Sequence, residues 1–115
     1  MENCIFCKIV EGSIPSDKVY EDEKILAFKD IHPVAPVHLL IIPKKHIENL
    51  MNVKQEDNEI MAAIFSAVPQ IAEKMGVAKE GFRLISNCGK DAGQEVMHLH
   101  FHLIGGLKLG TKIIH

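Results

Sequence analysis

Three histidines at alternate positions are the residues of this 115-residue chain best suited to chemistry. His98, His100 and His102 are separated by the apolar residues Leu99 and Phe101. Strict alternation of polar and apolar residues predicts a half-buried β-strand whose apolar side chains enter the core. The opposite face would then carry three imidazoles, each about 6.7 Å from the next. Because imidazole titrates near neutral pH, this face suits proton transfer, nucleophilic attack or metal binding.

The spacing of these rings limits how they could share a metal ion. In a straight strand the backbones of His98 and His102 lie about 13 Å apart, whereas zinc needs each ring nitrogen at about 2.1 Å. The row therefore argues against a three-histidine zinc hydrolase, although His98 and His100 could share an ion with outside ligands. The alternative is a row of solvated histidines on an exposed sheet face, and the glycine-containing loop before the row argues against it.

A second group of reactive residues lies at the amino end, where Cys4 and Cys7 form a CxxC motif. This motif can be half of a zinc site, a redox dithiol or a pair of small buried apolar side chains. The redox interpretation expects a preceding strand, and the sequence offers none before Cys4. A zinc site would need two more ligands, which the seven histidines of the chain could supply.

A polar loop at residues 88–94 contains Gly89 and Gly93 and leads directly to the histidines. Glycine adopts positive φ without strain and lets backbone N–H groups approach an anion closely. The loop is therefore a candidate phosphate seat, although it could also be a plain connection between strands. A fourth histidine, His38, stands at the start of the apolar run 37–43, where its ring could reach a site at the rim of a sheet. Alone it would more often be structural.

The segments that must position these residues show strand and helix patterns. β-formers flank a charged turn and predict a hairpin at 18–20 and 24–28, and the run 37–43 predicts a central strand. We expect a helix that follows a capping box at Asn52 and Gln55, ends at Gly76, and is kinked or broken around Pro69. A turn or short helix ends at Gly12, two further strands cover 81–87 and the histidine segment through 104, and the tail 107–115 stays unassigned.

The composition excludes several classes of protein. Hydrophobic residues make up 47% and charged residues 24% of the chain, which fits one globular domain spanning residues 1–115. The formal net charge of −2 offers no basic surplus for nucleic acid or an anionic membrane. The sequence shows no secretory signal, no apolar run of membrane-spanning length and no disulfide framework. We therefore expect a cytoplasmic protein without nucleic-acid or membrane partners.

The segment from His98 to Ile104 resembles the signature of the histidine triad (HIT) family, HφHφHφφ with φ apolar. Residues 4–10, 28–33, 35–46 and 87–106 resemble its Hint-like branch, the nucleoside phosphoramidate hydrolases, in order and spacing across nearly the whole chain. The resemblance implies an α+β protein with the HIT-like fold. That fold is a five-stranded antiparallel sheet with one long helix, here Pro-kinked, and a short N-terminal helix. It also implies a homodimer.

The resemblance further implies a hydrolase or transferase that attacks the α-phosphate of purine nucleoside phosphoramidates, such as AMP-lysine adducts. His100 would be the nucleophile and form a covalent nucleotidyl-histidine, which splits one hard displacement into two easier ones. His38 would orient that ring, and His102 would contact the phosphate and help to protonate the leaving amine. The remaining nucleotide contacts are implied for Asp30 at the ribose, Ile31 at the base, Asn87, and the backbone of Gly93, Gln94, Glu95 and Val96.

Some relatives bind a structural zinc ion, and the resemblance carries that ligand set to Cys4, Cys7, His46 and His98 here. A closed Cys2His2 tetrahedron suits structural zinc, and no organic cofactor is implied. Two features depart from the family pattern. Glu95 replaces a common Ser or Thr beside the phosphate, and the tail lacks a Trp-Pro-Pro ending that is tied to substrate choice.

Three alternatives remain beside the phosphoramidase. A dinucleoside polyphosphate hydrolase would use the same histidines, and the Hint-like amino half argues against it. A nucleotide-binding regulatory module with weak catalysis is kept open by Glu95, because a carboxylate beside a bound phosphate is repulsive unless it turns outward. A redox dithiol protein would form a reversible disulfide between Cys4 and Cys7.

Overall fold

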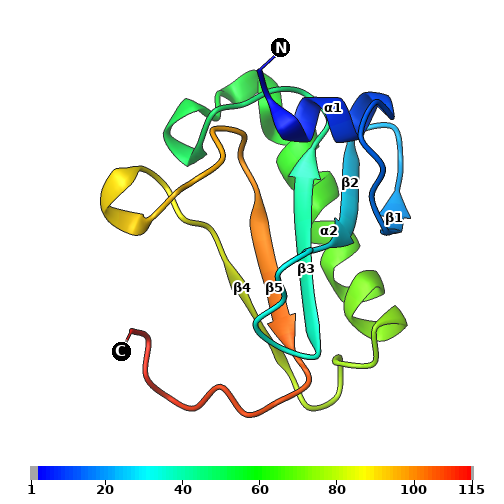
Figure 1. The fold of residues 1–115 in the computed structure, drawn as a ribbon, viewed down its shortest axis with the longest axis vertical. Coiled ribbons are helices and arrows are strands. Elements are labelled where there is room, and N and C mark those ends of the chain that lie inside the picture. Colours follow the sequence, from blue (N-terminus) through cyan, green and yellow to red (C-terminus); the bar gives the residue numbers. More distant parts are fainter. Residues whose placement is uncertain (1–2, 115) are drawn as a thin grey trace.

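The computed structural model describes residues 3–114, which form one antiparallel sheet with helices packed on both faces. Its elements are α1 (Ile5–Glu11), β1 (Lys18–Glu21), β2 (Ile25–Lys29), β3 (Val37–Pro43), α2 (Asn58–Lys74), β4 (Phe82–Ile85) and β5 (Phe101–Gly105), with one-turn 3-10 helices at Leu50–Asn52, Gln55–Asp57 and Lys90–Ala92. The strand order is β1-β2-β3-β5-β4, and α2 crosses behind β2 and β3 in Figure 1. The expected α+β class and five-stranded antiparallel sheet are confirmed.

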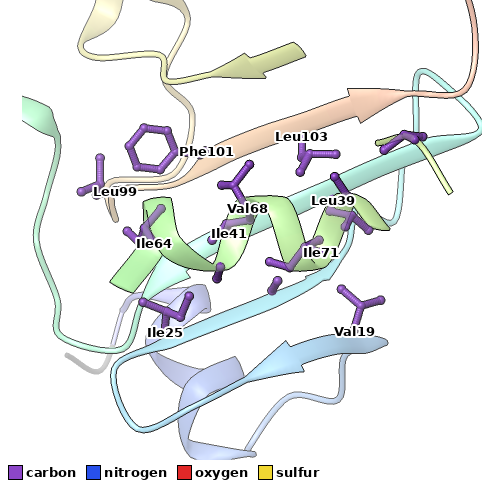
Figure 2. Packing of buried hydrophobic residues seen from close by; sticks show 14 of the residues in the cluster. Val19, Ile25, Leu39, Ile41, Ile64, Val68, Ile71, Leu99, Phe101 and Leu103 are labelled. Atoms are coloured by element: carbon purple, nitrogen blue, oxygen red, sulfur yellow. The ribbon is translucent and has the colours of Figure 1, made fainter. Parts of the chain in front are cut away.

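Apart from His38, strand β3 is apolar because both faces of the sheet are covered. Leu39 and Ile41 pack into the larger core beneath α2, whereas Leu40 and Ile42 join the smaller core that includes Phe6 of α1. The prediction that this strand is central is thereby confirmed. Figure 2 shows the larger core, in which the α2 residues Ile64, Val68 and Ile71 lie against side chains of β3 and β5.

Helix α2 begins later than the sequence suggested. The capping box expected at Asn52 and Gln55 is wrong, because the first residue of α2 is Asn58. Asn52 instead closes a one-turn 3-10 helix, which Asn49 caps by accepting the N–H of Met51 at 3.0 Å. Two 3-10 turns, Leu50–Asn52 and Gln55–Asp57, therefore precede the helix. The Asn49 side chain accepts a backbone N–H that would otherwise need a partner at the start of a longer helix.

The break expected near Pro69 does not occur, because α2 is continuous from Asn58 to Lys74. Pro69 lies on the exposed side of the helix. Because proline has no N–H to donate, the carbonyl of Phe65 loses its helical partner and can bind water instead. Gly76 ends the helix as predicted, with φ at +76° and its N–H donated to the carbonyl of Glu73 at 3.1 Å. None of the helices within residues 3–114 is long and apolar enough to cross a membrane.

The histidine segment is a strand only in its second half, which corrects the prediction. Sheet pairing begins at Phe101, and Leu99 donates its N–H to the carbonyl of Ile47 at 2.6 Å instead of to a neighbouring strand. The alternation of faces nevertheless holds, since Leu99, Phe101 and Leu103 all enter the larger core. The three imidazoles therefore lie on the face that α1 covers, where they are more buried than an open sheet face would make them.

Candidate active site and metal cluster

His102 and His38 come together because β3 and β5 are neighbours in the sheet. The register pairs Leu40 with His102 and His38 with Ile104, so the two histidines are diagonal neighbours on one face. Nε2 of His38 lies 2.9 Å from Nδ1 of His102. We call Asp30, His38, His100 and His102 the ring cluster.

The hydrogen atoms of His38 and His102 can be assigned from the backbone. Val34 donates its N–H to Nδ1 of His38 at 3.1 Å, so in the neutral ring Nε2 must carry the hydrogen. That Nε2–H donates to Nδ1 of His102 and leaves a second N–H on Nε2 of His102. Burial lowers the pKa of His102, and the nearby His100 and His38 lower it further, so this ring is neutral at pH 7.

His100 has the opposite tautomer. Its Nδ1 lies 2.7 Å from the carbonyl oxygen of His98, which can only accept, so Nδ1 carries the hydrogen and Nε2 keeps its lone pair. Within residues 3–114 the only buried unpaired side-chain polar atoms are the hydroxyls of Ser16 and Ser86. Nε2 of His100 and Nε2 of His102 have no partner there and therefore reach the surface.

The expected contact between His38 and His100 is not the one found. The carbonyl of His98 orients His100, whereas His38 orients His102 and lies 3.4 Å from Oδ2 of Asp30. The reason is the late start of β5, because the carbonyl of His98 is free from strand pairing and can turn toward the ring two residues later. Phe6 packs edge-on against His100, with ring centroids 5.2 Å apart, and supports this position.

Asp30, His38 and His102 also lie close enough together to suggest a cation site, with ligand atoms within 4.8 Å of one another. The N–H of Val34 argues against that use. It occupies Nδ1 of His38, so Nε2 could bind a cation only if the ring lost its single N–H hydrogen and became an anion. His38 and His102 therefore form a hydrogen-bond relay, with Oδ2 of Asp30 3.4 Å from Nε2 of His38.

The loop before the histidines is closed by its own hydrogen bonds. Gly93 donates to Lys90 at 3.0 Å and Gln94 donates to Gly89 at 3.1 Å, so two of the four expected backbone donors are used internally. Within residues 3–114 the N–H groups of Glu95 and Val96 have no acceptor. Both residues line an open cavity of about 810 Å³ that is also lined by Cys4 and His46 and by none of the ring cluster, and the Glu95 side chain is exposed. The loop thus offers two free donors beside a cavity.

The other expected nucleotide contacts lie at the rim of the sheet. Asp30 accepts the N–H of His32 at 2.8 Å through Oδ1, so Oδ2 is the oxygen that faces His38. Ile31 is 85% exposed, which leaves its side chain free to contact a ligand. Asn87 is half-buried, and within residues 3–114 its side chain has no hydrogen-bond partner.

The structure brings together all four expected metal ligands, Cys4, Cys7, His46 and His98, which we call the thiol cluster. Nδ1 of His98 lies 3.2 Å from Sγ of Cys4 and 3.6 Å from Sγ of Cys7, and Nδ1 of His46 lies 3.3 Å from Sγ of Cys7. A tetrahedral zinc ion would set such sulfur–nitrogen distances at about 3.5 Å. The cluster is therefore placed to bind a metal ion.

The surroundings of the thiol cluster suit a metal. His98 is fully buried and donates its Nε2–H to the carbonyl of Pro43 at 2.8 Å, which leaves the lone pair on Nδ1 toward the cysteines. Burial lowers the pKa of His98 to about 4, so the ring is neutral. Cys7 donates its backbone N–H to Sγ of Cys4 at 3.3 Å. Without a cation, burial and Cys4 raise the pKa of the Cys7 thiol to about 11, so this thiol has to lose its proton as a metal binds.

Sequence reasoning missed the groups that orient the rings. Three of them are backbone groups, the N–H of Val34 and the carbonyls of Pro43 and His98. Their role cannot be recognised from residue type. Phe6, between the two cysteines, was missed as the packing partner of both His98 and His100.

Comparison with known proteins gives a consistent family assignment. A model of the HIT domain matches residues 11–109. The purine nucleoside phosphoramidase of Escherichia coli K12 is 44% identical over 114 residues, covering 99% of this chain and 96% of that protein. Protein HitA of Neisseria gonorrhoeae is 47% identical over 105 residues, or 91% of this chain and 97% of HitA. A solved HIT family hydrolase from Clostridium thermocellum is 51% identical, with a TM-score of 0.96 and 99% of each chain covered. The chain therefore belongs to the HIT domain family.

Proposed function

We propose that this HIT domain is a hydrolase that attacks the α-phosphorus of purine nucleoside phosphoramidates with Nε2 of His100. One observation carries the proposal, the 2.7 Å contact that fixes hydrogen on Nδ1 of His100 and leaves its other nitrogen nucleophilic. The similarity to the purine nucleoside phosphoramidase of E. coli supports the substrate class.

The proposed reaction has two displacements. In the first, Nε2 of His100 bonds to phosphorus and the P–N bond breaks with its electron pair on nitrogen. This nitrogen takes a proton from water, while the neutral His102 donates a hydrogen bond to it from Nε2 and keeps its own hydrogen. In the second, water bonds to phosphorus and gives up a proton to solvent, and the bond to His100 breaks with its electron pair on Nε2 to release the nucleotide. The Nε2–H of His38 donates to His102 throughout and so keeps the hydrogen of His102 on the nitrogen that faces the leaving group. Acid catalysis of this kind contributes about 10²–10⁴ in rate.

The free N–H groups of Glu95 and Val96 would receive the phosphoryl oxygens as negative charge develops on them, and one such donor contributes about 10²–10³ where it has been measured. In the same arrangement Asp30 accepts the ribose hydroxyls, Ile31 covers the base, and Asn87 donates to the nucleotide. The side chain of Glu95 is exposed, so its carboxylate can remain in solvent while its N–H serves the phosphate.

We infer that the metal of the thiol cluster is zinc with a structural role, because two thiolates and two imidazoles are its preferred closed set. Cys4, Cys7, His46 and His98 would hold it, and the bound ion would cross-link α1 to the segments that follow β3 and precede β5. No organic cofactor is part of the proposal. We also propose a cytoplasmic homodimer, and the three free cysteines fit a reducing compartment.

The test follows AMP release from adenosine 5′-phosphoramidate. We expect His100→Ala to slow release by about 10³-fold or more while AMP still binds. His32→Ala removes an exposed imidazole at the rim of the site, where only the backbone N–H of His32 contacts Asp30, and should leave kcat within about threefold of the parent. Equal rates in parent and His100→Ala would refute the nucleophile assignment. AMP binding without turnover in the parent would instead favour the regulatory module, and faster cleavage of a diadenosine polyphosphate would favour that substrate class.

A further inference from the structure

Gln94 is a buried polar side chain that the proposed reaction does not use directly. It is only 7% exposed, and all of its amide hydrogen-bonding groups are occupied by backbone atoms. Its Oε1 accepts the N–H of Gly89 at 2.9 Å, while its Nε2 donates to the carbonyls of Glu48 at 2.9 Å and Val96 at 3.0 Å. The amide orientation is unambiguous, because the N–H can only donate and the two carbonyls can only accept.

These bonds hold the loop on both sides of its two free donors. On one side, Gln94 and Gly89 bind each other twice, since the backbone N–H of Gln94 also donates to the carbonyl of Gly89 at 3.1 Å. On the other side, the carbonyl of Val96 is held by the Gln94 amide. The unpaired N–H groups of Glu95 and Val96 lie between these two fixed points, so the directions in which they can point are restricted.

The third bond ties the loop to the rest of the site. Glu48 follows Ile47, whose carbonyl accepts the N–H of Leu99, and His46 belongs to the thiol cluster. The hydrogen bond to Glu48 therefore fixes the loop relative to the segment 46–48, which also contacts the histidine segment. The backbone of a loop held this way changes its conformation little when an anion binds, and such preorganisation is the condition for strong electrostatic stabilisation.

We propose that Gln94 is a positioning residue that aims the N–H groups of Glu95 and Val96 at the phosphate of a bound nucleotide. This inference rests on the proposed function, because it takes the loop as the phosphate seat. It assigns no chemical step to Gln94, whose side chain stays bonded to the backbone.

The test compares two ligands that differ only in phosphate, AMP and adenosine, by calorimetric titration of the full chain. Gln94→Met keeps the length of the side chain and removes all three hydrogen bonds. We expect AMP affinity to fall by about tenfold or more while adenosine affinity changes by less than about twofold. Gln94→Leu also removes all three side-chain hydrogen bonds and adds no charge, so it should show the same selective loss. Gln70→Met makes the same change on the exposed face of α2 and should alter neither affinity.

A merely structural role would weaken both ligands by the same factor or leave both unchanged, and either result in the Gln94 variants would overturn the inference. Thermal melting identifies any variant that does not fold, and the other of the two Gln94 variants then decides. The proposed function fails separately, if the parent protein binds neither ligand. Cleavage of adenosine 5′-phosphoramidate should show a lower kcat/KM in Gln94→Met, by about 10²-fold.

Discussion

The thiol cluster and the ring cluster contain the same kind of side chain and use it in opposite ways. His98 donates from Nε2 to the carbonyl of Pro43 and presents Nδ1 to two cysteines. His100 donates from Nδ1 to the carbonyl of His98 and presents Nε2 to the surface. In each ring a backbone carbonyl accepts the N–H hydrogen and so determines which nitrogen keeps its lone pair. The neighbouring side chains then determine whether that nitrogen faces a metal site or a substrate.

His98 also joins the two clusters, because its ring belongs to one and its carbonyl orients the other. The clusters can therefore be separated experimentally only through residues other than His98.

Removing the metal should affect stability most. We expect a strong chelator, or Cys7→Ser, to lower Tm by about 10 °C or more, because binding energy at a structural metal site is folding energy. Elemental analysis of protein purified without chelator should find one zinc per chain, and Cys88→Ser, which changes a cysteine outside the cluster, should retain it. An unchanged Tm after metal loss would show that the thiol cluster does not hold the fold together.

Breaking the relay should affect turnover and leave the metal alone. His38→Phe fills the same space but cannot donate to His102, so we expect kcat for AMP release to fall about 10²-fold. Zinc content and AMP affinity should stay near those of the parent protein. A kcat within about threefold of the parent would contradict the relay.

The pKa of His102 offers a finer test, read from its imidazole resonances in an NMR titration. Burial, His100 and His38 lower this pKa below the ordinary 6.5, whereas Asp30 opposes them. Asp30→Asn should therefore lower the pKa of His102 further. Because the unfolded chain takes up this proton first, the free energy of unfolding should fall as pH drops below about 6.5. A His102 pKa above 6.5 would contradict the assigned geometry.

The charge of Glu95 should matter least. Its side chain is exposed, so solvent screens its repulsion of a bound phosphate. We expect Glu95→Gln to strengthen AMP binding by about two- to threefold in low salt, with the gain disappearing in high salt. Glu73→Gln, on the exposed face of α2, is the matched control. A large gain in turnover in Glu95→Gln would mean that the carboxylate reaches the reacting phosphate.

The central position of β3 and the faces of the sheet were predictable because they depend on residue type. The run 37–43 is apolar on both faces, and Leu99, Phe101 and Leu103 alternate as a core strand must. The start of β5 was not predictable, because the alternation continues through His98 although sheet pairing does not. Strand pairing depends on where β3 and β4 end, which the histidine segment itself does not encode.

The same limit applies to the site. The thiol cluster could be predicted from residue types and a family resemblance, since cysteine and histidine can be recognised in a sequence as potential metal ligands. The pairing inside the ring cluster did not follow, because it depends on the N–H of Val34 and the carbonyl of His98. Every residue carries a backbone carbonyl and every residue except proline an N–H, so only their positions in the fold reveal which of them orient a ring.

The most direct test of the account is to capture the intermediate on His100. Protein mixed with adenosine 5′-phosphoramidate and quenched within milliseconds would be digested without acid and analysed by mass spectrometry. Nucleophilic attack by His100 predicts an AMP adduct on the peptide that contains His100, located on that residue by fragmentation, absent from His100→Ala and present in His32→Ala. Full turnover with no adduct, or an adduct on His102 instead, would contradict it.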